Sequence, residues 1–232
     1  MSVQYQKIVI NFKKEKSFLT HVLKLCFNII CCATRKEKIS ALTAIFIDFM
    51  DKKQEVIALA GKYIRDVPDF PKPGIIFKDI VPVFENPEYL QMVFDVMVDE
   101  LKKNNIQFDK IACPEARGFL FGPTLGLAMK KGVVMARKPG KLPCPGESLS
   151  YDLEYGSATL VVSKESIKPG DRVVVVDDLL ATGGSAKALC QLVEKCGGTV
   201  AGVMFYIELT PLKGREVLKD YPVISIVPVE AY

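Results

Sequence analysis

The stretch Arg172–Ala186, RVVVVDDLLATGGSA, constrains the fold of this chain more than any other. Its four consecutive valines, Val173–Val176, form a β-branched apolar run that is too short for a helix and does not alternate with polar residues. Such a run is typical of a strand buried on both faces of a parallel sheet. Two carboxylates, Asp177 and Asp178, follow it, then a turn of small and apolar residues, and a helical pattern begins at Ser185. This order predicts an α/β protein with a ligand site at the carboxyl edge of its sheet.

The turn and the acid pair suggest two different ligand groups. A helix start offers unpaired N–H groups and a partial positive charge, which suit a phosphate. Gly183 and Gly184 allow the backbone to approach that phosphate closely, and Thr182 and Ser185 add hydroxyl donors. Carboxylates would repel a phosphate, but they suit sugar hydroxyls or a cation bridged by those hydroxyls. The stretch therefore predicts a phosphate cradle beside a ribose site.

Two common phosphate motifs do not fit this stretch. A P-loop needs a glycine before its lysine, and Lys187 follows an alanine. A dinucleotide fingerprint needs the G-x-G-x-x-G spacing, which the adjacent pair Gly183-Gly184 lacks. A buried strand followed by a polar turn and a helix cap would explain the valines and Ser185. It would not explain two adjacent acids ahead of T-G-G.

The acid pair and the T-G-G-S turn together resemble the phosphoribosyl pyrophosphate (PRPP) motif of the type I phosphoribosyltransferases. The resemblance implies that the acids hold the ribose and that the turn holds its 5-phosphate. It also implies the fold of that family, a mainly parallel sheet flanked by helices, with a small hood over the base and a mobile catalytic loop. The implied ribose 5-phosphate site comprises Asp177, Asp178, Ala181, Thr182, Gly183, Gly184 and Ser185.

Composition excludes several other functions. Residues 1–49 hold eight Lys/Arg and three Asp/Glu, whereas the rest of the chain holds 23 and 24, so its body offers no electrostatic case for binding nucleic acid. The only histidine, His21, lies in the same first segment, which excludes a Ser-His-Asp or Cys-His mechanism and a histidine metal site in the body. Seven cysteines without C-x-x-C spacing argue against a disulfide framework. Cys113, Cys144, Cys190 and Cys196 are most simply small packing residues in a reducing compartment, so a cytoplasmic location is expected.

Residues 1–49 are predicted to be an extension of unknown role, outside a phosphoribosyltransferase domain over residues 50–232. The apolar stretch Phe18–Ala33 is interrupted by polar residues and is short for a bilayer, so no membrane association is expected. The segment also lacks the pattern of a secretory or mitochondrial signal. Met50, where a compact domain would begin, is a candidate alternative start.

Hydrophobic periodicity predicts alternating helices and strands over the body, and therefore a mainly parallel sheet covered on both faces. The predicted helices cover residues 54–67, 90–101, 123–131, 185–196 and 213–219. The predicted strands cover residues 75–77, 110–113, 133–136, 158–162, 173–176, 200–207 and 223–227. The segment 137–156, rich in proline and glycine, is expected to be a long functional loop.

Four further segments resemble one subfamily, the adenine phosphoribosyltransferases. The first, Pro68–Ile80, reads as a proline-rich linker by itself, and the resemblance implies a hood over the base. There Phe77 would stack on the purine, with Leu179 on the opposite face. Backbone groups near Ile76 and Lys78 would read the amino edge of adenine, where a 6-oxo base would place an acceptor against an acceptor.

The next two segments supply cations after predicted strand ends. Arg117, in the segment Pro114–Gly122, can bind pyrophosphate oxygens bidentately. The resemblance implies that Glu115 and Ala116 also contribute to this loop, with a cis peptide bond between them. In the segment 137–143 it implies pyrophosphate contacts from Arg137 and Lys141, partly across a dimer interface.

The fourth segment, Tyr151–Gly156, could by itself be an exposed strand. The resemblance implies that it is the mobile catalytic loop, with Glu154 near the purine imidazole and Tyr155 near the ribose and pyrophosphate. Glu154 is the candidate for handling the purine proton. The implied catalytic residues are Glu154, Arg117, Lys141 and Tyr155.

The resemblance implies the reaction of adenine with PRPP to give AMP and pyrophosphate in a homodimer. Mg²⁺ would be carried by PRPP near Asp177 and Asp178, with no direct protein ligand. Two alternatives stay open. A 6-oxopurine phosphoribosyltransferase shares the PRPP motif but usually carries a different base-binding segment. A purine- or PRPP-responsive regulator could use residues 1–49 to bind DNA, although that segment lacks a convincing helix-turn-helix pattern.

Overall fold

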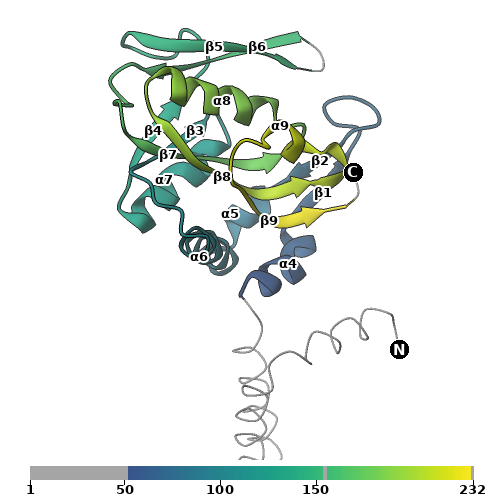
Figure 1. Cartoon of the computed structure of the whole chain (residues 1–232). Helices are drawn as coiled ribbons and strands as arrows, with labels where there is room; N and C mark the ends of the chain where they lie inside the picture. Colours follow the sequence, from purple (N-terminus) through teal and green to yellow (C-terminus); the bar gives the residue numbers. More distant parts are fainter. Residues whose placement is uncertain (1–51, 154–155, 231–232) are drawn as a thin grey trace, which may run out of the picture. The chain divides into compact units, whose positions relative to one another are not determined.

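The computed structural model describes residues 52–153 and 156–230. By its internal contacts the chain divides into two units, Met1–Asp51 and Lys52–Tyr232, of which the first lies outside the described residues. The second unit is an α/β fold, drawn in Figure 1. Among the described residues, no helix has both the length and the apolar character needed to cross a membrane.

A five-stranded sheet forms the centre of this unit, and all of its strand pairs are parallel. The strand that carries the valine run lies in the middle, where both of its edges are hydrogen-bonded. The strands, in spatial order, are β4 (Gly132–Ala136), β3 (Lys110–Pro114), β7 (Arg172–Leu180), β8 (Thr199–Leu209) and β9 (Val223–Val229).

The valine run joins the two hydrophobic cores of the unit, one on each face of the sheet. Val174 and Val176 belong to the core on one face, whereas Val173 and Val175 belong to the core on the other. All four side chains are fully buried. Because successive side chains of a strand point to opposite faces, a strand covered on both sides needs an apolar residue at every position. This explains the missing alternation.

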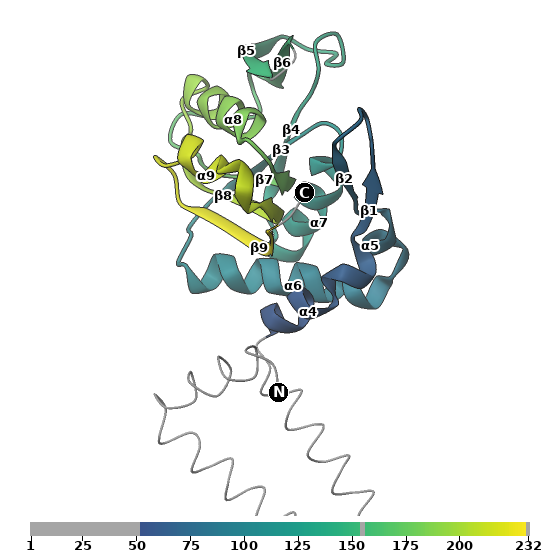
Figure 2. The ribbon, with the colours of Figure 1, turned by 90° about the vertical axis from the view of Figure 1, so that its right-hand side faces the viewer.

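Helices cover both faces of the sheet. Figure 2 shows α4 (Lys52–Tyr63) and α6 (Pro87–Lys103) along one side, and α8 (Gly184–Lys195) on the other. On the first side, the buried Tyr89 hydroxyl donates to the carbonyl oxygen of Val56 at 2.9 Å and lies 3.0 Å from the Tyr206 hydroxyl. This contact joins α4, α6 and β8. The remaining helices are α5 (Val81–Glu85), α7 (Gly118–Met129), α9 (Gly214–Val217) and the 3-10 turn η2 (Thr210–Leu212).

Two antiparallel hairpins lie outside the main sheet. The first pairs β1 (Arg65–Pro68) with β2 (Ile76–Asp79). The second pairs β5 (Gly146–Leu153) with β6 (Gly156–Ser163), and Figure 1 shows α8 between this hairpin and the sheet. Both hairpins are formed by segments of the two predicted substrate-binding regions, the hood and the catalytic loop.

All seven predicted strands are present, but several boundaries were wrong. The first helix ends at Tyr63, because residues 65–68 pair with β2 instead. The central strand continues through the acid pair to Leu180, hydrogen-bonded to β8. Part of the predicted loop 137–156 is strand β5, because residues 146–153 find a partner in β6.

The helix predicted to begin at Pro123 begins at Gly118, with the proline inside it. Proline fits the first turn of a helix, so the local sequence favours a helix start at Pro123. Tertiary packing outweighs that preference, since Gly122 lets the helix approach β3 so closely that a Cβ there would overlap the Sγ atom of Cys113. Three short elements, α5, β1 and η2, were not predicted at all.

Candidate active site

The acid pair lies at the carboxyl end of the central strand. Asp178 is 3% exposed and Asp177 is half-buried. The backbone N–H of Asp178 donates to Oδ1 of Asp177 at 2.9 Å, which holds the first carboxylate against the backbone. Burial raises the pKa of Asp177 well above its usual value, and the neighbouring charge of Asp178 raises it further. Hydrogen-bond donors or a cation supplied by a ligand would stabilise the charged form of such a pair.

Arg117, the N-cap residue of α7, lies beside this pair. Its Nε atom is 3.0 Å from Oδ2 of Asp178, but the N–H does not point at that oxygen, so the contact is an ion pair without a hydrogen bond. Arg117 Nη1 and Asp178 Oδ2 are buried, and neither has a hydrogen-bond partner within residues 52–153 and 156–230. Unpaired buried polar atoms are rare in native proteins. These two therefore indicate a ligand that supplies both an acceptor and a donor.

The glycine turn connects this strand to α8. Gly183, the N-cap residue of α8, has a φ of 85°, in the left-handed region that glycine adopts without strain. A Cβ at this position would lie 2.7 Å from the carbonyl oxygen of Gly214. Among the residues that the structure describes, no side chain caps the N-terminus of α8, so its first N–H groups can bind an anion. The predicted donors Thr182 and Ser185 are exposed and half-buried.

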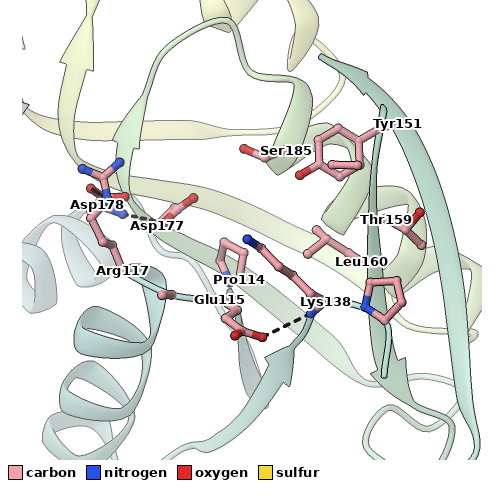
Figure 3. Close-up of a pocket in the computed structure, with 13 residues that line it drawn as sticks. Pro114, Glu115, Arg117, Lys138, Tyr151, Thr159, Leu160, Asp177, Asp178 and Ser185 are labelled. Carbon is pink, nitrogen blue, oxygen red and sulfur yellow. Dashed lines mark hydrogen bonds and ion pairs between the residues drawn. The ribbon is translucent and has the colours of Figure 1, made fainter. Parts of the chain in front are cut away.

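A cavity of about 510 Å³ joins these features (Figure 3). Its acidic wall is the pair on β7, and its other walls carry the loop after β3, the loop after β4, the start of α8 and the β5–β6 hairpin. The cavity thus combines carboxylates, which accept hydrogen bonds from hydroxyl groups, with cations and hydroxyls, which bind phosphate groups. A ligand that carries both hydroxyl and phosphate groups would fit it. The lining residues are Pro114, Glu115, Ala116, Arg117, Lys138, Pro139, Tyr151, Ala158, Thr159, Leu160, Asp177, Asp178 and Ser185.

The loop after β3 has the predicted cis peptide bond between Glu115 and Ala116. Glu115 Oε2 accepts from the backbone N–H of Lys138 at 3.2 Å and from Nε of Arg137 at 3.4 Å. The hydrogen bond from Lys138 lowers the pKa of Glu115, and the charge of Arg137 contributes. Arg137 Nη1 also donates to the carbonyl oxygen of Lys141 at 3.0 Å. The contacts of Glu115 hold the loop after β3 against the loop after β4.

The cations predicted for this region are placed differently from one another. Arg137 is engaged with Glu115 and does not line the cavity, and Lys141 is exposed. Lys138, between them in the sequence, lines the cavity, and Figure 3 shows its amine pointing into it. The R-K-P-G-K cluster indicated a cationic loop, but only the path of the chain after β4 selects the lysine that faces inward.

The predicted base-binding residues lie on β2 and β7. Phe77 is half-buried, and the guanidinium carbon of Arg117 lies 5.1 Å from its ring centroid, so the hood lies beside the acid pair. Ile76 and Leu179 are also half-buried. Lys78 is 6% exposed, and its Nζ atom lies 2.8 Å from Oδ1 of Asp66 in the adjacent strand. Its side chain therefore ties the hood together.

The other predicted site residues either do not line the cavity or lie outside the described residues. Ala181, Thr182, Gly183 and Gly184 form the turn but do not line the cavity. Glu154 and Tyr155, predicted to act in catalysis, lie outside the described residues. Sequence reasoning did not assign seven of the lining residues to the site. Tyr151 had a signal in the Tyr-Leu-Tyr alternation; the others are Pro114, Lys138, Pro139, Ala158, Thr159 and Leu160.

Comparison with known proteins places these motifs in one family. A sequence model of the phosphoribosyl transferase domain matches residues 83–228. The chain is 49% identical over 166 residues to the adenine phosphoribosyltransferase of Pseudothermotoga lettingae, covering 72% of this chain and 96% of that protein. It is 52% identical over 169 residues to that of Francisella philomiragia, covering 71% and 97%.

Solved structures agree with this similarity. The adenine phosphoribosyltransferase of Thermoanaerobacter pseudethanolicus has a TM-score of 0.72 and 45% identity, covering 76% of this chain and 99% of that one. The Saccharomyces cerevisiae enzyme, solved with adenine and an imino-altritol bisphosphate, has a TM-score of 0.70 and 39% identity, covering 76% and 98%. The Trypanosoma brucei enzyme, solved with AMP, pyrophosphate and ribose 5-phosphate, has a TM-score of 0.65 and 28% identity, covering 78% and 80%.

Proposed function

The chain belongs to the adenine phosphoribosyltransferase family, and we propose that it transfers the phosphoribosyl group of PRPP to adenine, giving AMP and pyrophosphate. One observation carries this proposal. A single cavity has the acid pair on one wall, with Arg117, Lys138 and the N-terminus of α8 around it. Neutral sugar hydroxyls suit the first wall, and phosphates suit the rest.

The reaction is a displacement at the anomeric carbon of the ribose. Its transition state resembles an oxocarbenium ion, as in glycoside hydrolysis. Asp177 and Asp178 accept hydrogen bonds from the ribose hydroxyls and stabilise the cationic ring, while Arg117 stabilises charge on the departing pyrophosphate. Lys138, Arg137 and Lys141 add positive charge around that group.

The hood and the catalytic loop position the base. Phe77 and Leu179 lie on the two faces of adenine, and backbone groups at Ile76 and Lys78 read its amino edge. Glu154 handles the proton of the purine imidazole, and Tyr155 contacts the ribose and pyrophosphate. The chain needs no nucleophilic histidine or cysteine, because no covalent enzyme intermediate forms.

Magnesium fits the acid pair. Asp178 presents a buried carboxylate oxygen without a hydrogen-bond partner in the part of the chain that is described, and Mg²⁺ prefers such oxygen ligands. Within the same part, no group of three or more His, Cys, Asp or Glu side chains is placed to hold a metal ion. We infer that Mg²⁺ would be carried by PRPP, with Asp177 and Asp178 as the carboxylates beside it, and that it would supply positive charge against the pyrophosphate.

The direct test is pyrophosphate release with PRPP, Mg²⁺ and one purine at a time. Adenine is expected to support turnover at least about 10⁴-fold better than hypoxanthine, because a site that pairs with an amino group leaves buried groups unpaired against a 6-oxo base. The control omits the purine and measures hydrolysis of PRPP alone. Turnover with hypoxanthine that equals turnover with adenine would contradict the proposed reading of the amino edge, and a preference for hypoxanthine would indicate a 6-oxopurine enzyme. No pyrophosphate with either base would refute transferase activity.

We also propose that the enzyme is a cytoplasmic homodimer, with a phosphoribosyltransferase domain over residues 50–232 and an extension over residues 1–49. Three large apolar side chains on α7 and β4 support a second copy as the partner: Leu127 is 84% exposed, Met135 51% and Leu120 45%. Leu120 and Leu127 are seven residues apart, which places them on one face of α7, and β4 contacts this helix. Exposed apolar groups on one face are typical of protein interfaces.

Leu127→Glu is expected to shift the protein from dimer to monomer at micromolar concentration, because it places a charge within the apolar contact. Sedimentation equilibrium measures the mass. Val217→Glu is the matched control, since Val217 is 43% exposed and lies on α9 instead of α7 or β4. A wild-type protein that sediments as a monomer would disprove the dimer, and an unchanged L127E mass would disprove this interface.

A further inference from the structure

We propose that Tyr151 is a substrate-binding residue whose hydroxyl donates a hydrogen bond to the 5-phosphate of PRPP beside Ser185. This proposal rests on the transferase function proposed above and adds a residue to its phosphate site. The tyrosine predicted for the catalytic loop was Tyr155. Tyr151 lies four residues earlier, on strand β5, and lines the cavity.

The position of the ring directs the hydroxyl into the cavity. Tyr151 is half-buried, and its ring packs with Leu149 against the hydrophobic core beneath α8. Figure 3 shows the ring next to Ser185, with its hydroxyl on the side of the cavity that Ser185 and Lys138 line. The aromatic body is thus held by packing while the polar end reaches the site.

The groups around this hydroxyl are mainly hydrogen-bond donors. Ser185 offers a hydroxyl, Lys138 an ammonium, and the start of α8 its uncapped N–H groups. The Tyr151 hydroxyl makes no hydrogen bond within the described ranges 52–153 and 156–230. Burial raises its pKa, and the charge of Asp177 raises it further, so the hydroxyl keeps its proton at neutral pH. These donors converge on one side of the cavity, and the carboxylates of Asp177 and Asp178 lie on the neighbouring wall. A phosphate would accept hydrogen bonds from the donors.

Ion pairs at the base of the hairpin fix the register of β5 against α8. Glu147 lies 2.9 Å from Lys164 and 3.1 Å from Lys195, and Lys195 donates to the carbonyl oxygen of Ser148 at 3.1 Å. Lys195 is the last residue of α8, whereas Ser185 is in its first turn, about 15 Å away along the axis. Three strand residues from Ser148 cover about 10 Å, and a tyrosine side chain covers the rest.

This geometry couples the hairpin to the phosphate. β5 runs from the C-terminus of α8 toward its N-terminus, and Tyr151 on this strand lines the same cavity as Ser185 at the helix start. A phosphate bound by Ser185 and Tyr151 therefore links the glycine turn to strand β5, which precedes Glu154 in the sequence. The hydroxyl belongs to the PRPP site and does not contribute to binding the base.

The test is Tyr151→Phe, which removes the hydroxyl and keeps the ring. Calorimetry is expected to show that PRPP and ribose 5-phosphate each bind about tenfold more weakly, because the lost hydrogen bond is to a charged group. Adenine affinity should stay within about twofold, and the thermal midpoint should be unchanged. Tyr221→Phe is the matched control, since that hydroxyl donates to Glu194 of α8 outside the cavity.

Binding of ribose 5-phosphate tests the role of Tyr151 independently of the transferase function, because this affinity is measured without turnover. Equal affinity of wild type and Y151F for ribose 5-phosphate would overturn the assignment, even if the wild type makes AMP. A Y221F variant that loses the same affinity would also overturn it, since the effect would then come from the packing of α8. Failure of the wild type to make AMP would contradict the proposed reaction instead.

Discussion

Asp177→Asn/Asp178→Asn is expected to lower the rate of AMP formation at saturating adenine and PRPP by about 10²–10⁴-fold. Each carboxylate loses charge-assisted hydrogen bonds to the ribose, which are worth about 1.5–3 kcal/mol apiece, and the pair also loses its stabilisation of the cationic ring. Pyrophosphate release measured in steady state checks the rate. The matched control is Asp95→Asn/Asp99→Asn, the same chemical change on α6, which should keep wild-type activity.

Removing the charge of Asp177 is expected to leave the free energy of unfolding unchanged or to raise it, although activity falls. The pKa of Asp177 is raised in the folded protein, mainly by burial, so folding disfavours its charged form. When the pH is above the pKa of an unfolded aspartate, this carboxyl therefore lowers the free energy of unfolding. At a pH below that pKa the carboxyl is protonated in both states, and the destabilisation disappears. Asp177→Asn alone should therefore unfold at pH 7 at the same temperature as wild type or higher, because it keeps the ion pair between Asp178 and Arg117. A double asparagine variant that keeps wild-type turnover would refute the ribose assignment, and an Asp177→Asn variant that unfolds at a lower temperature would contradict the electrostatic argument.

Arg117→Met is expected to lower kcat/KM for PRPP by about 10²–10³-fold, the effect of removing one preorganised charge from a site of this kind. The buried Nη1 atom has no hydrogen-bond partner in residues 52–153 and 156–230, so it is available to a pyrophosphate oxygen. The variant also leaves Asp178 without its cation. Adenine affinity in the absence of PRPP should change much less.

Arg117→Lys sharpens this prediction. Lysine restores the charge but not the planar fork of the guanidinium, so it should recover only part of the lost activity. Arg172→Met serves as the matched control, because Arg172 pairs with Asp109 on the surface and does not line the cavity. If R117M stays within about threefold of wild type for PRPP, the arginine does not contact pyrophosphate.

The central motif was predictable because its information is local. A strand, an acid pair, a glycine turn and a helix start follow one another within the fifteen residues of Arg172–Ala186, and each depends on side chains of that segment. Gly183 is an example of such local information, because its φ of 85° favours a residue without a Cβ. Even here the strand end was misjudged, because pairing with β8 extends β7 to Leu180.

The rest of the site depended on contacts between distant segments. The R-K-P-G-K cluster favoured Arg137 and Lys141, but Glu115, 22 residues earlier, engages Arg137, and the inward-facing lysine is Lys138. Tyr151 could not be placed from alternation alone, because pairing of β5 with β6 decides which side chains face α8.

The sequence by itself determined the order of strands and helices, the nature of the acid pair and the glycine turn, and the absence of a catalytic histidine from the body. These follow from short-range patterns and from the chemistry of single residues. Only the tertiary structure decided that Arg117 lies against both Asp178 and Phe77, and that a hairpin outside the sheet brings Tyr151 to the start of α8. Those contacts join segments tens of residues apart, and packing of the whole domain selects them.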